Sequence, residues 1–166
     1  MSVSCLSPAK TFNIAGMVDA MAVIANEAYR EPFHDFAHRY QINKTNVFAS
    51  AAIETAYSQG EGWLDELLAY LQGNIGFLRS YLHDHLPQVK LIEPEGTYLV
   101  WLNFEALGLD AKALEEFLAQ EAQLALNSGY WFGREGAGYA RMNIACPRGI
   151  LQEALLRLTQ AVRSRL

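Results

Sequence analysis

Cysteine is scarce in this 166-residue sequence, which contains only Cys5 and Cys146. The two residues are far apart, and neither belongs to a CxxC pair. The sequence therefore offers neither the disulfide framework of a small secreted protein nor a cysteine-rich zinc site. Two isolated cysteines suit a reducing compartment, so we expect free thiols in a cytoplasmic protein.

Long apolar runs and an excess of basic charge are also missing. No uncharged apolar stretch approaches the roughly 18 residues that a membrane-spanning helix needs. The N-terminus has no basic segment leading into an apolar one, so no secretory signal is expected. The 13 Lys and Arg are outnumbered by 18 Asp and Glu, and the net charge is -5. This balance argues against nucleic acid or an anionic membrane as the main partner.

What the sequence does contain is typical of a globular protein. Hydrophobic residues make up 51% and charged residues 19%, enough to build a packed core. There is no internal repeat or low-complexity tract. A pair of histidines, His34 and His38, has a spacing that can bind metal, but no third ligand is evident and no metal site is expected. The length predicts one domain, or one domain and part of another.

In the first part of the chain, residues 2–6 are predicted to form a short buried strand that ends at Ser7-Pro8, because Pro8 cannot continue a central ladder. Residues 17–25 are apolar, and periodicity alone does not decide between strand and helix. Residues 31–40 are predicted to be helical. A second helix is predicted over residues 46–57, with Asn46 as its cap.

A leucine-rich stripe follows, and it is the clearest periodic pattern in the sequence. Its spacing of four and three residues is typical of one face of a long helix that ends near Leu86-Pro87. Packing of this stripe on a core is favoured over a coiled coil, because flanking Glu/Lys pairs are few. The stripe comprises Leu64, Leu68, Leu71, Ile75, Leu78 and Leu82.

The last part of the chain is predicted to be a compact α+β unit with helices on one face of a sheet. Residues 97–104 are predicted to form a central strand, residues 124–126 a brief one, and residues 139–144 a strand whose Ala140, Met142 and Ile144 share one face. Asp110 is expected to cap a short helix. Pro147 is expected to open the final helix.

Two charged residues lie in unusual places. Arg141 falls within a predicted strand among apolar neighbours, where a guanidinium is costly unless it is paired. Its partner would be a protein carboxylate, which is modestly favoured, or the carboxylate of a ligand. Lys10 follows the first strand and is either a solvated charge or an amine presented for chemistry. A desolvated lysine amine becomes a nucleophile more readily.

The stretch around Lys10, "SPAKTFNIAG" (7–16), resembles the Schiff-base lysine segment of the aspartate-aminotransferase-like pyridoxal-phosphate (PLP) enzymes. More narrowly, the chain is similar to their MalY/PatB-type cystathionine β-lyase branch. The resemblance covers essentially the whole chain, because four further stretches agree in order: "AAIETAYSQGEGWLDELLAYLQGN" (51–74), "EGTYLVWLNFEALGL" (95–109), "ALNSGYWFG" (125–133) and "GYARMNIACPR" (138–148).

This resemblance implies a fold and a domain organisation. The fold would be the α/β PLP-transferase fold of type I. Residues 1–62 would be a remnant of the PLP-binding large domain, and residues 63–166 a long connecting helix with the α+β C-terminal small domain. Most of the family's cofactor contacts lie upstream of the lysine. The chain is therefore expected to be a C-terminal fragment that binds the cofactor poorly alone.

The resemblance also implies roles for individual residues. Lys10 would be the catalytic lysine that holds the cofactor, pyridoxal 5'-phosphate, as a Schiff base. Arg141 would clamp the substrate α-carboxylate. Ser7 would contact the cofactor phosphate, a role that the resemblance supports less strongly than those of Lys10 and Arg141. Many related aminotransferases have an arginine eight residues after the lysine. Val18 stands there in this chain, and this departure favours the lyase branch.

The implied activity is a PLP-dependent carbon–sulfur β-lyase that converts cysteine S-conjugates to thiol, pyruvate and ammonia. The first alternative is a class I/II aminotransferase, which uses the same lysine and arginine. The second is an inactive remnant, or a subunit that needs an N-terminal partner. The implied partners are a small amino-acid substrate and, in the complete enzyme, a second copy of the same chain in a homodimer.

Overall fold

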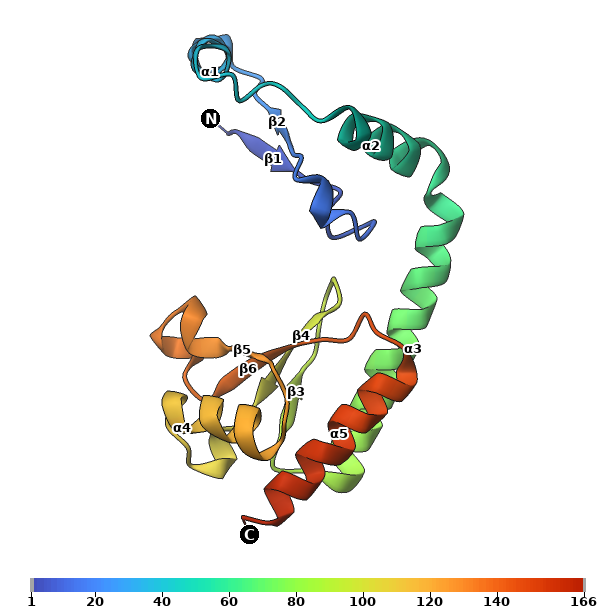
Figure 1. Cartoon of the computed structure of the whole chain (residues 1–166), viewed down its shortest axis with the longest axis vertical. Coiled ribbons are helices and arrows are strands. Elements are labelled where there is room, and N and C mark those ends of the chain that lie inside the picture. The colour runs from blue at the N-terminus through green and yellow to red at the C-terminus, as the bar shows by residue number, and fades with distance from the viewer. Residues whose placement is uncertain (1, 166) are drawn as a thin grey trace. The chain divides into compact units, whose positions relative to one another are not determined.

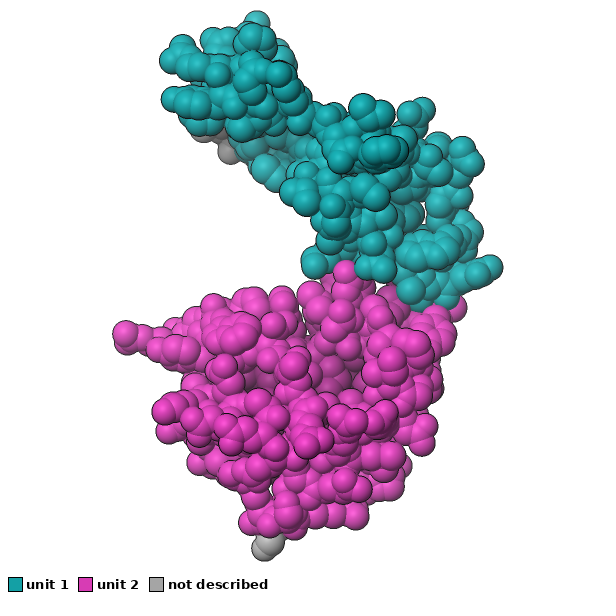
Figure 2. Space-filling model, viewed as in Figure 1, with its two compact units in different colours: residues 1–67 teal, residues 68–166 magenta. Residues whose placement is uncertain are grey.

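The computed structural model of the protein describes residues 2–165. The chain divides into two compact units, residues 1–67 and residues 68–166 (Figure 2). The division falls within the long helix α3 (Glu61–His85), so this one element contributes residues to both units.

Besides the first residues of α3, the first unit contains a two-stranded antiparallel sheet and the helices α1 and α2 (Figure 1). Strand β1 (Ser4–Leu6) pairs with β2 (Met21–Val23), and the apolar stretch that periodicity left undecided thus contains a strand. A 3₁₀ turn, Ala15–Met17, lies between the two strands. Helices α1 (Glu27–Arg39) and α2 (Val47–Gln59) follow.

Asparagine caps begin both helices of this unit. The Asn46 side chain accepts a hydrogen bond from the Phe48 amide, which confirms the predicted cap of α2. The Asn26 side chain accepts from the Ala28 amide in the same way. Helix α1 therefore begins four residues before its predicted start at residue 31, and Pro32 lies inside it.

A strand does form within residues 2–6, as predicted, but the prediction that it is buried is wrong. Strand β1 is exposed along its length, and the side chains of Val3 and Leu6 are 51% and 50% accessible. Each strand of the ribbon has only three residues, and no layer within the described part of unit 1 covers it. The apolar side chains that unit 1 does bury are small in number: Pro8, Ile24, Ala37 and Ala49.

The second unit is built on the C-terminal part of α3, whose end at His85 confirms the predicted length. The stripe is buried from Leu71 onward, whereas Leu68 is exposed. The final helix α5 (Arg148–Arg163) lies beside α3, and the hydroxyls of Tyr81 and Thr159 are 3.1 Å apart across the two helices (Figure 1).

A four-stranded antiparallel sheet completes the second unit and confirms the α+β prediction. Its strands are β3 (Lys90–Ile92), β4 (Leu99–Asn103), β5 (Asn127–Ser128) and β6 (Tyr139–Asn143). The spatial order is β3-β4-β6-β5, so the two five-residue strands β4 and β6 are central.

The pleat of β4 and β6 separates a core face from an open face. Val100 and Leu102 of β4 and Ala140 and Met142 of β6 are buried on the core face. The alternating residues point the other way, so Arg141 lies on the open face, as predicted. In the register of the sheet, it is opposite Trp101 of β4 and Asn127 of β5.

The segment between β4 and β5 follows the prediction in part. The Asp110 carboxylate accepts from the Ala113 amide and caps α4 (Ala111–Glu116), as expected. The predicted strand at residues 124–126 is wrong, and pairing begins at Asn127. The Leu124 amide instead donates to the Leu118 carbonyl and closes the π-helical turn Phe117–Glu121. No helix within residues 2–165 is long and apolar enough to cross a membrane.

Candidate functional site

Lys10 lies at the surface of unit 1, in a turn that follows β1. Two backbone hydrogen bonds close this turn around it: the Phe12 amide donates to the Pro8 carbonyl at 2.9 Å, and the Ile14 amide donates to Ala9 at 3.1 Å. The lysine side chain is exposed, and it forms no ion pair within residues 2–165. The turn therefore presents a primary amine to its surroundings.

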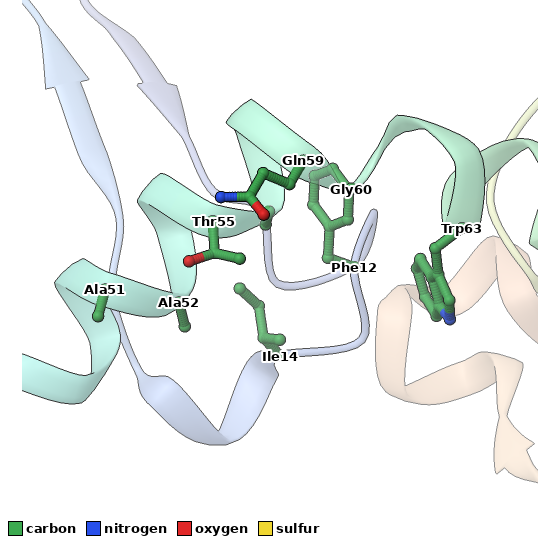
Figure 3. Close-up of a pocket in the computed structure, with 9 residues that line it drawn as sticks. Phe12, Ile14, Ala51, Ala52, Thr55, Gln59, Gly60 and Trp63 are labelled. Carbon is green, nitrogen blue, oxygen red and sulfur yellow. The ribbon is translucent and has the colours of Figure 1, made fainter.

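Phe12 fastens this turn to helix α2. Its ring lies 5.7 Å from the ring of Tyr57 and 6.2 Å from that of Trp63. Gly60 makes the approach possible, because a Cβ at that position would lie 2.8 Å from the Phe12 ring. Figure 3 shows Phe12 beside Gly60 at the end of α2, within a pocket of about 620 Å³ lined mostly by apolar side chains.

Ser7 lies next to the turn, and its hydroxyl is already engaged. It donates to the Asp19 carbonyl at 3.1 Å and accepts from the Ala9 amide at 3.2 Å. A phosphate oxygen bound at Ser7 would need the hydroxyl proton that Asp19 now receives. Contact between Ser7 and a phosphate therefore requires this hydroxyl to reorient.

Val18 has an unusual backbone conformation. Its φ of 51° and ψ of 53° are left-handed, a region that β-branched residues rarely occupy, and its side chain is 89% exposed. The Val18 amide donates to the Ala15 carbonyl and ends the 3₁₀ turn. Such a conformation costs free energy and persists only where the surrounding structure stabilises it. The strained residue lies between Lys10 and β2 in the sequence.

Arg141 lies in unit 2, at the centre of β6. One of its Nη atoms donates to the Asn127 side-chain oxygen at 2.9 Å, and its guanidinium carbon lies 4.6 Å above the centroid of the Phe132 ring. The protein carboxylate that was modestly favoured as its partner is absent within residues 2–165. Its Nε is buried and has no hydrogen-bond partner there.

Aromatic side chains surround Arg141 on the open face of the sheet. The Trp101 ring meets Phe132 edge-on at 5.3 Å and Tyr139 at 6.5 Å. Phe132 is 53% exposed on this face. Asn127 was missed, because only the pairing of β5 with β6 brings it beside Arg141.

A polar network behind β6 fixes the strand to α3. Asn74 is fully buried, and its amide donates to the Ile144 carbonyl at 2.8 Å and the Cys146 carbonyl at 3.1 Å. Its oxygen accepts from Arg148 Nε at 2.6 Å. Burial raises the pKa of the neighbouring Cys146 thiol, which suits a structural cysteine.

Among the described residues 2–165, no group of three or more His, Cys, Asp or Glu side chains is arranged to hold a metal ion.

The two residues singled out by the sequence, Lys10 and Arg141, lie in different units. Lys10 is an exposed amine on a turn of unit 1. Arg141 is a guanidinium on the open face of the unit 2 sheet, held by an amide and an aromatic ring.

Comparison with known proteins places the chain among relatives of similar sequence and fold. No family model matches it. Cystathionine beta-lyase PatB from Bacillus subtilis is 37% identical over 98% of the chain and 42% of PatB. Cystalysin from Treponema denticola, whose structure contains pyridoxal 5'-phosphate, is 34% identical over 99% of the chain and 42% of cystalysin, with a TM-score of 0.91.

A PLP-bound protein from Clostridium difficile 630, named as an aminotransferase, is 43% identical over 96% of this chain and 41% of its own, with a TM-score of 0.93. The chain therefore spans about two fifths of the length of the proteins that it matches. Over nearly its whole length, the chain corresponds in sequence and fold to the C-terminal part of the fold-type-I, aspartate-aminotransferase-like PLP proteins of the MalY/PatB type.

Proposed function

We propose that this chain forms the C-terminal part of a PLP-dependent carbon–sulfur β-lyase. The reaction converts a cysteine S-conjugate and water to a thiol, pyruvate and ammonia. The observation that carries the proposal is the environment of Arg141, a guanidinium without a carboxylate partner among residues 2–165. An amino-acid substrate provides the missing carboxylate.

The cofactor in this proposal is pyridoxal 5'-phosphate, and the chain supplies groups of the right chemistry for it. Lys10 offers a primary amine on an exposed turn, which suits the cofactor's aldehyde. Ser7, three residues earlier, offers a hydroxyl for the phosphate once this hydroxyl turns away from the Asp19 carbonyl to which it now donates. When bound, the cofactor supplies an electron sink that makes the Cα–H of an attached amino acid acidic.

In this proposal, the Lys10 amine takes the Cα proton of the substrate as a general base. Loss of this proton allows the thiolate at Cβ to leave, and hydrolysis of the remaining three-carbon unit gives pyruvate and ammonia. The turn that carries Lys10 is fastened to α2 through Phe12, so the amine is presented from a fixed backbone.

Arg141 binds the substrate α-carboxylate and orients it. Asn127 and the Phe132 ring hold the guanidinium on the sheet, so it loses little freedom when the carboxylate arrives. A fixed carboxylate keeps the breaking Cα–H bond in one orientation, which is the geometric requirement of the reaction. Asn127 is thus a positioning residue for Arg141.

The proposal includes the organisation of the whole protein. Residues 1–62 belong to the PLP-binding large domain, and residues 63–166 form the connecting helix and small domain. The complete enzyme is a cytoplasmic homodimer that acts on a small amino acid. Because the chain covers 42% of PatB, these properties belong to a longer assembly that also supplies the other cofactor contacts.

An aminotransferase is the alternative that a specific observation favours. The C. difficile protein named as an aminotransferase is 43% identical to this chain. Lys10 and Arg141 serve both reactions equally. Val18, which stands where many related aminotransferases have an arginine, favours the lyase.

A chimera tests the proposal. This chain replaces the aligned C-terminal part of PatB, and the PLP-loaded chimera is assayed with cystathionine. We expect release of pyruvate and ammonia. Lys10→Ala should abolish turnover and the borohydride fixation of cofactor at that position. Arg141→Lys should lower kcat/KM about tenfold to a hundredfold, because a bidentate carboxylate contact is lost.

Lys112→Ala is the matched control, since Lys112 is exposed and pairs with Glu116 on the same helix, α4. This variant should retain full turnover. A soluble, PLP-loaded chimera that transfers its amino group to keto acids without forming pyruvate would establish the aminotransferase instead. Turnover that survives Lys10→Ala would refute the role of Lys10 in both reactions.

A further inference from the structure

A pocket of about 450 Å³ lies on the open face of the sheet, beside Arg141. Trp101 and Tyr139 alternate with buried residues along β4 and β6, so their rings stand on the same face as the guanidinium. Phe132 joins the pocket to Arg141, because its ring lines the pocket and also lies 4.6 Å from the guanidinium carbon. The pocket is lined by Ile92, Trp101, Gly129, Phe132, Glu135, Gly136 and Tyr139.

The loop that forms one wall of this pocket is closely packed. A Cβ on Gly129 would lie 2.3 Å from the Gly136 oxygen, and a Cβ on Gly136 would lie 2.1 Å from the Gly129 oxygen. Two backbone segments therefore touch where no side chain fits. This contact brings Phe132 and Glu135, from two successive 3₁₀ turns, to the same pocket.

The lining of the pocket carries a negative charge, and the positive Arg141 guanidinium lies next to it, against Phe132. Among the lining residues, which the structure describes in full, Glu135 is the only Asp, Glu, Lys or Arg. It forms no ion pair within residues 2–165. A second carboxylate, that of Glu105, lies behind Tyr139 and accepts a hydrogen bond from Asn103 at 2.8 Å. Aromatic faces with a nearby carboxylate attract a cation.

We propose that this pocket is the subsite for the sulfur-linked group of the substrate, and that it selects a group that ends in a cation. This inference rests on the proposed function, because Arg141 then holds the α-carboxylate and the rest of the substrate extends past Phe132. The bound carboxylate neutralises Arg141. The distal ammonium lies against Trp101 and Tyr139, and Glu135 balances its charge.

The test measures binding to the 166-residue chain and needs no cofactor. The probes are S-(2-aminoethyl)-L-cysteine, which has a distal ammonium, and S-propyl-L-cysteine, which is neutral and similar in length. Binding is followed through the indole N–H resonance of Trp101. The signals of Trp63 and Trp131, which do not line this pocket, are references, and all three are assigned with Trp→Phe variants.

We expect both probes to shift the Trp101 signal, with the aminoethyl probe binding about fivefold more tightly. Glu135→Gln should bring the two affinities together. Glu66→Gln, an exposed control on α3, should leave the ratio unchanged. A preference that persists in Glu135→Gln, tighter binding of the propyl probe, or no shift of Trp101 with either probe overturns the subsite.

Arg141→Leu separates this inference from the proposed function. If Arg141 holds the α-carboxylate, this change weakens both probes by a similar factor and leaves their ratio intact. If each probe binds to Arg141→Leu as tightly as to the wild type, Arg141 does not hold the α-carboxylate. In that case, a ratio that still depends on Glu135 supports the cation pocket as a site in its own right.

Discussion

A single buried amide, Asn74, determines how the strand that carries Arg141 is attached to the rest of unit 2. Both of its polar atoms are used: the nitrogen reaches two carbonyls after β6, and the oxygen accepts from Arg148. The Arg148 guanidinium of α5 also lies 5.0 Å above the ring of Phe77, which is on α3 like Asn74. The network is fully buried at Asn74, so its loss leaves unpaired groups in the core.

Asn74→Ala should therefore destabilise unit 2 by about 1–3 kcal/mol, because the Ile144 carbonyl and the Arg148 Nε lose a hydrogen bond and the Cys146 carbonyl keeps only the Tyr70 hydroxyl. Urea unfolding followed through Trp101 fluorescence, in a chain that also carries Trp63→Phe and Trp131→Phe, measures this loss. Gln72→Ala, an exposed change on the same helix, should shift stability by less than about 0.5 kcal/mol. Equal effects of the two substitutions would contradict the role of the network.

The sequence predicted which face Arg141 occupies but not what surrounds it. Alternation along residues 139–144 is enough to separate Arg141 from Ala140 and Met142. Its neighbours Asn127 and Trp101 come from other strands, and their positions depend on sheet order and register. A single sequence does not contain this information, so the predicted carboxylate partner was wrong.

At the scale of elements, the loop between β5 and β6 depends on two glycines that contact each other although they are apart in the sequence. Gly129 and Gly136 are seven residues apart, and their backbones touch. In contrast, Gly76 of α3 has nothing within 4 Å of an added Cβ. The sequence shows all three as glycine, and only the structure separates a packing requirement from a tolerated residue.

Gly136→Ala should destabilise unit 2 by about 1–3 kcal/mol, since the new methyl group collides with the Gly129 backbone. Gly76→Ala is the matched control and should stabilise the chain by about 0.5–1 kcal/mol, because alanine loses less conformational entropy in a helix. The two variants are compared by urea unfolding as above. Changes of the same sign in both variants would contradict the expected collision at Gly136.

Helices with a strong local signal were predicted well, and elements that end through tertiary hydrogen bonds were not. The helix that carries the leucine-rich stripe and the caps Asn46 and Asp110 lie where the pattern placed them, although Leu68 of the stripe is exposed. The predicted strand at residues 124–126 failed, because the Leu124 amide is used by Leu118 and cannot pair with a strand. Its apolar composition alone gave no sign of this bond.

At the scale of the whole chain, the two units differ in how much they bury. Helix α1 buries only Ala37 and α2 only Ala49 among their described residues. Large apolar side chains of unit 1, including Phe33, Phe36 and Phe48, are about half exposed or more. Unit 2 buries Val100, Leu102 and Phe104 almost completely. Periodicity predicts which residues share a face, but it does not say whether another part of the protein covers that face.

This difference predicts unequal resistance to local unfolding. Backbone hydrogen bonds that are not covered by packed side chains open easily. Amide hydrogens of α1 and α2 should therefore exchange with solvent much faster than those of α5 and β6 in the same molecules. Hydrogen exchange measured by mass spectrometry on peptides from each helix gives this comparison directly, with α5 as the internal reference.

The exchange rate of α2 bears on Lys10, because the turn that carries Lys10 depends on Phe12 packing at the end of α2. When α2 opens, this support is lost, and the amine no longer has a fixed position in which to hold a cofactor. The isolated chain should therefore show rapid exchange in α2 together with no preferential borohydride fixation of pyridoxal phosphate at Lys10 over the exposed Lys44 and Lys112. Strong protection of α2 combined with selective labelling of Lys10 would mean that unit 1 is stable as it stands and that these 166 residues hold the cofactor unaided.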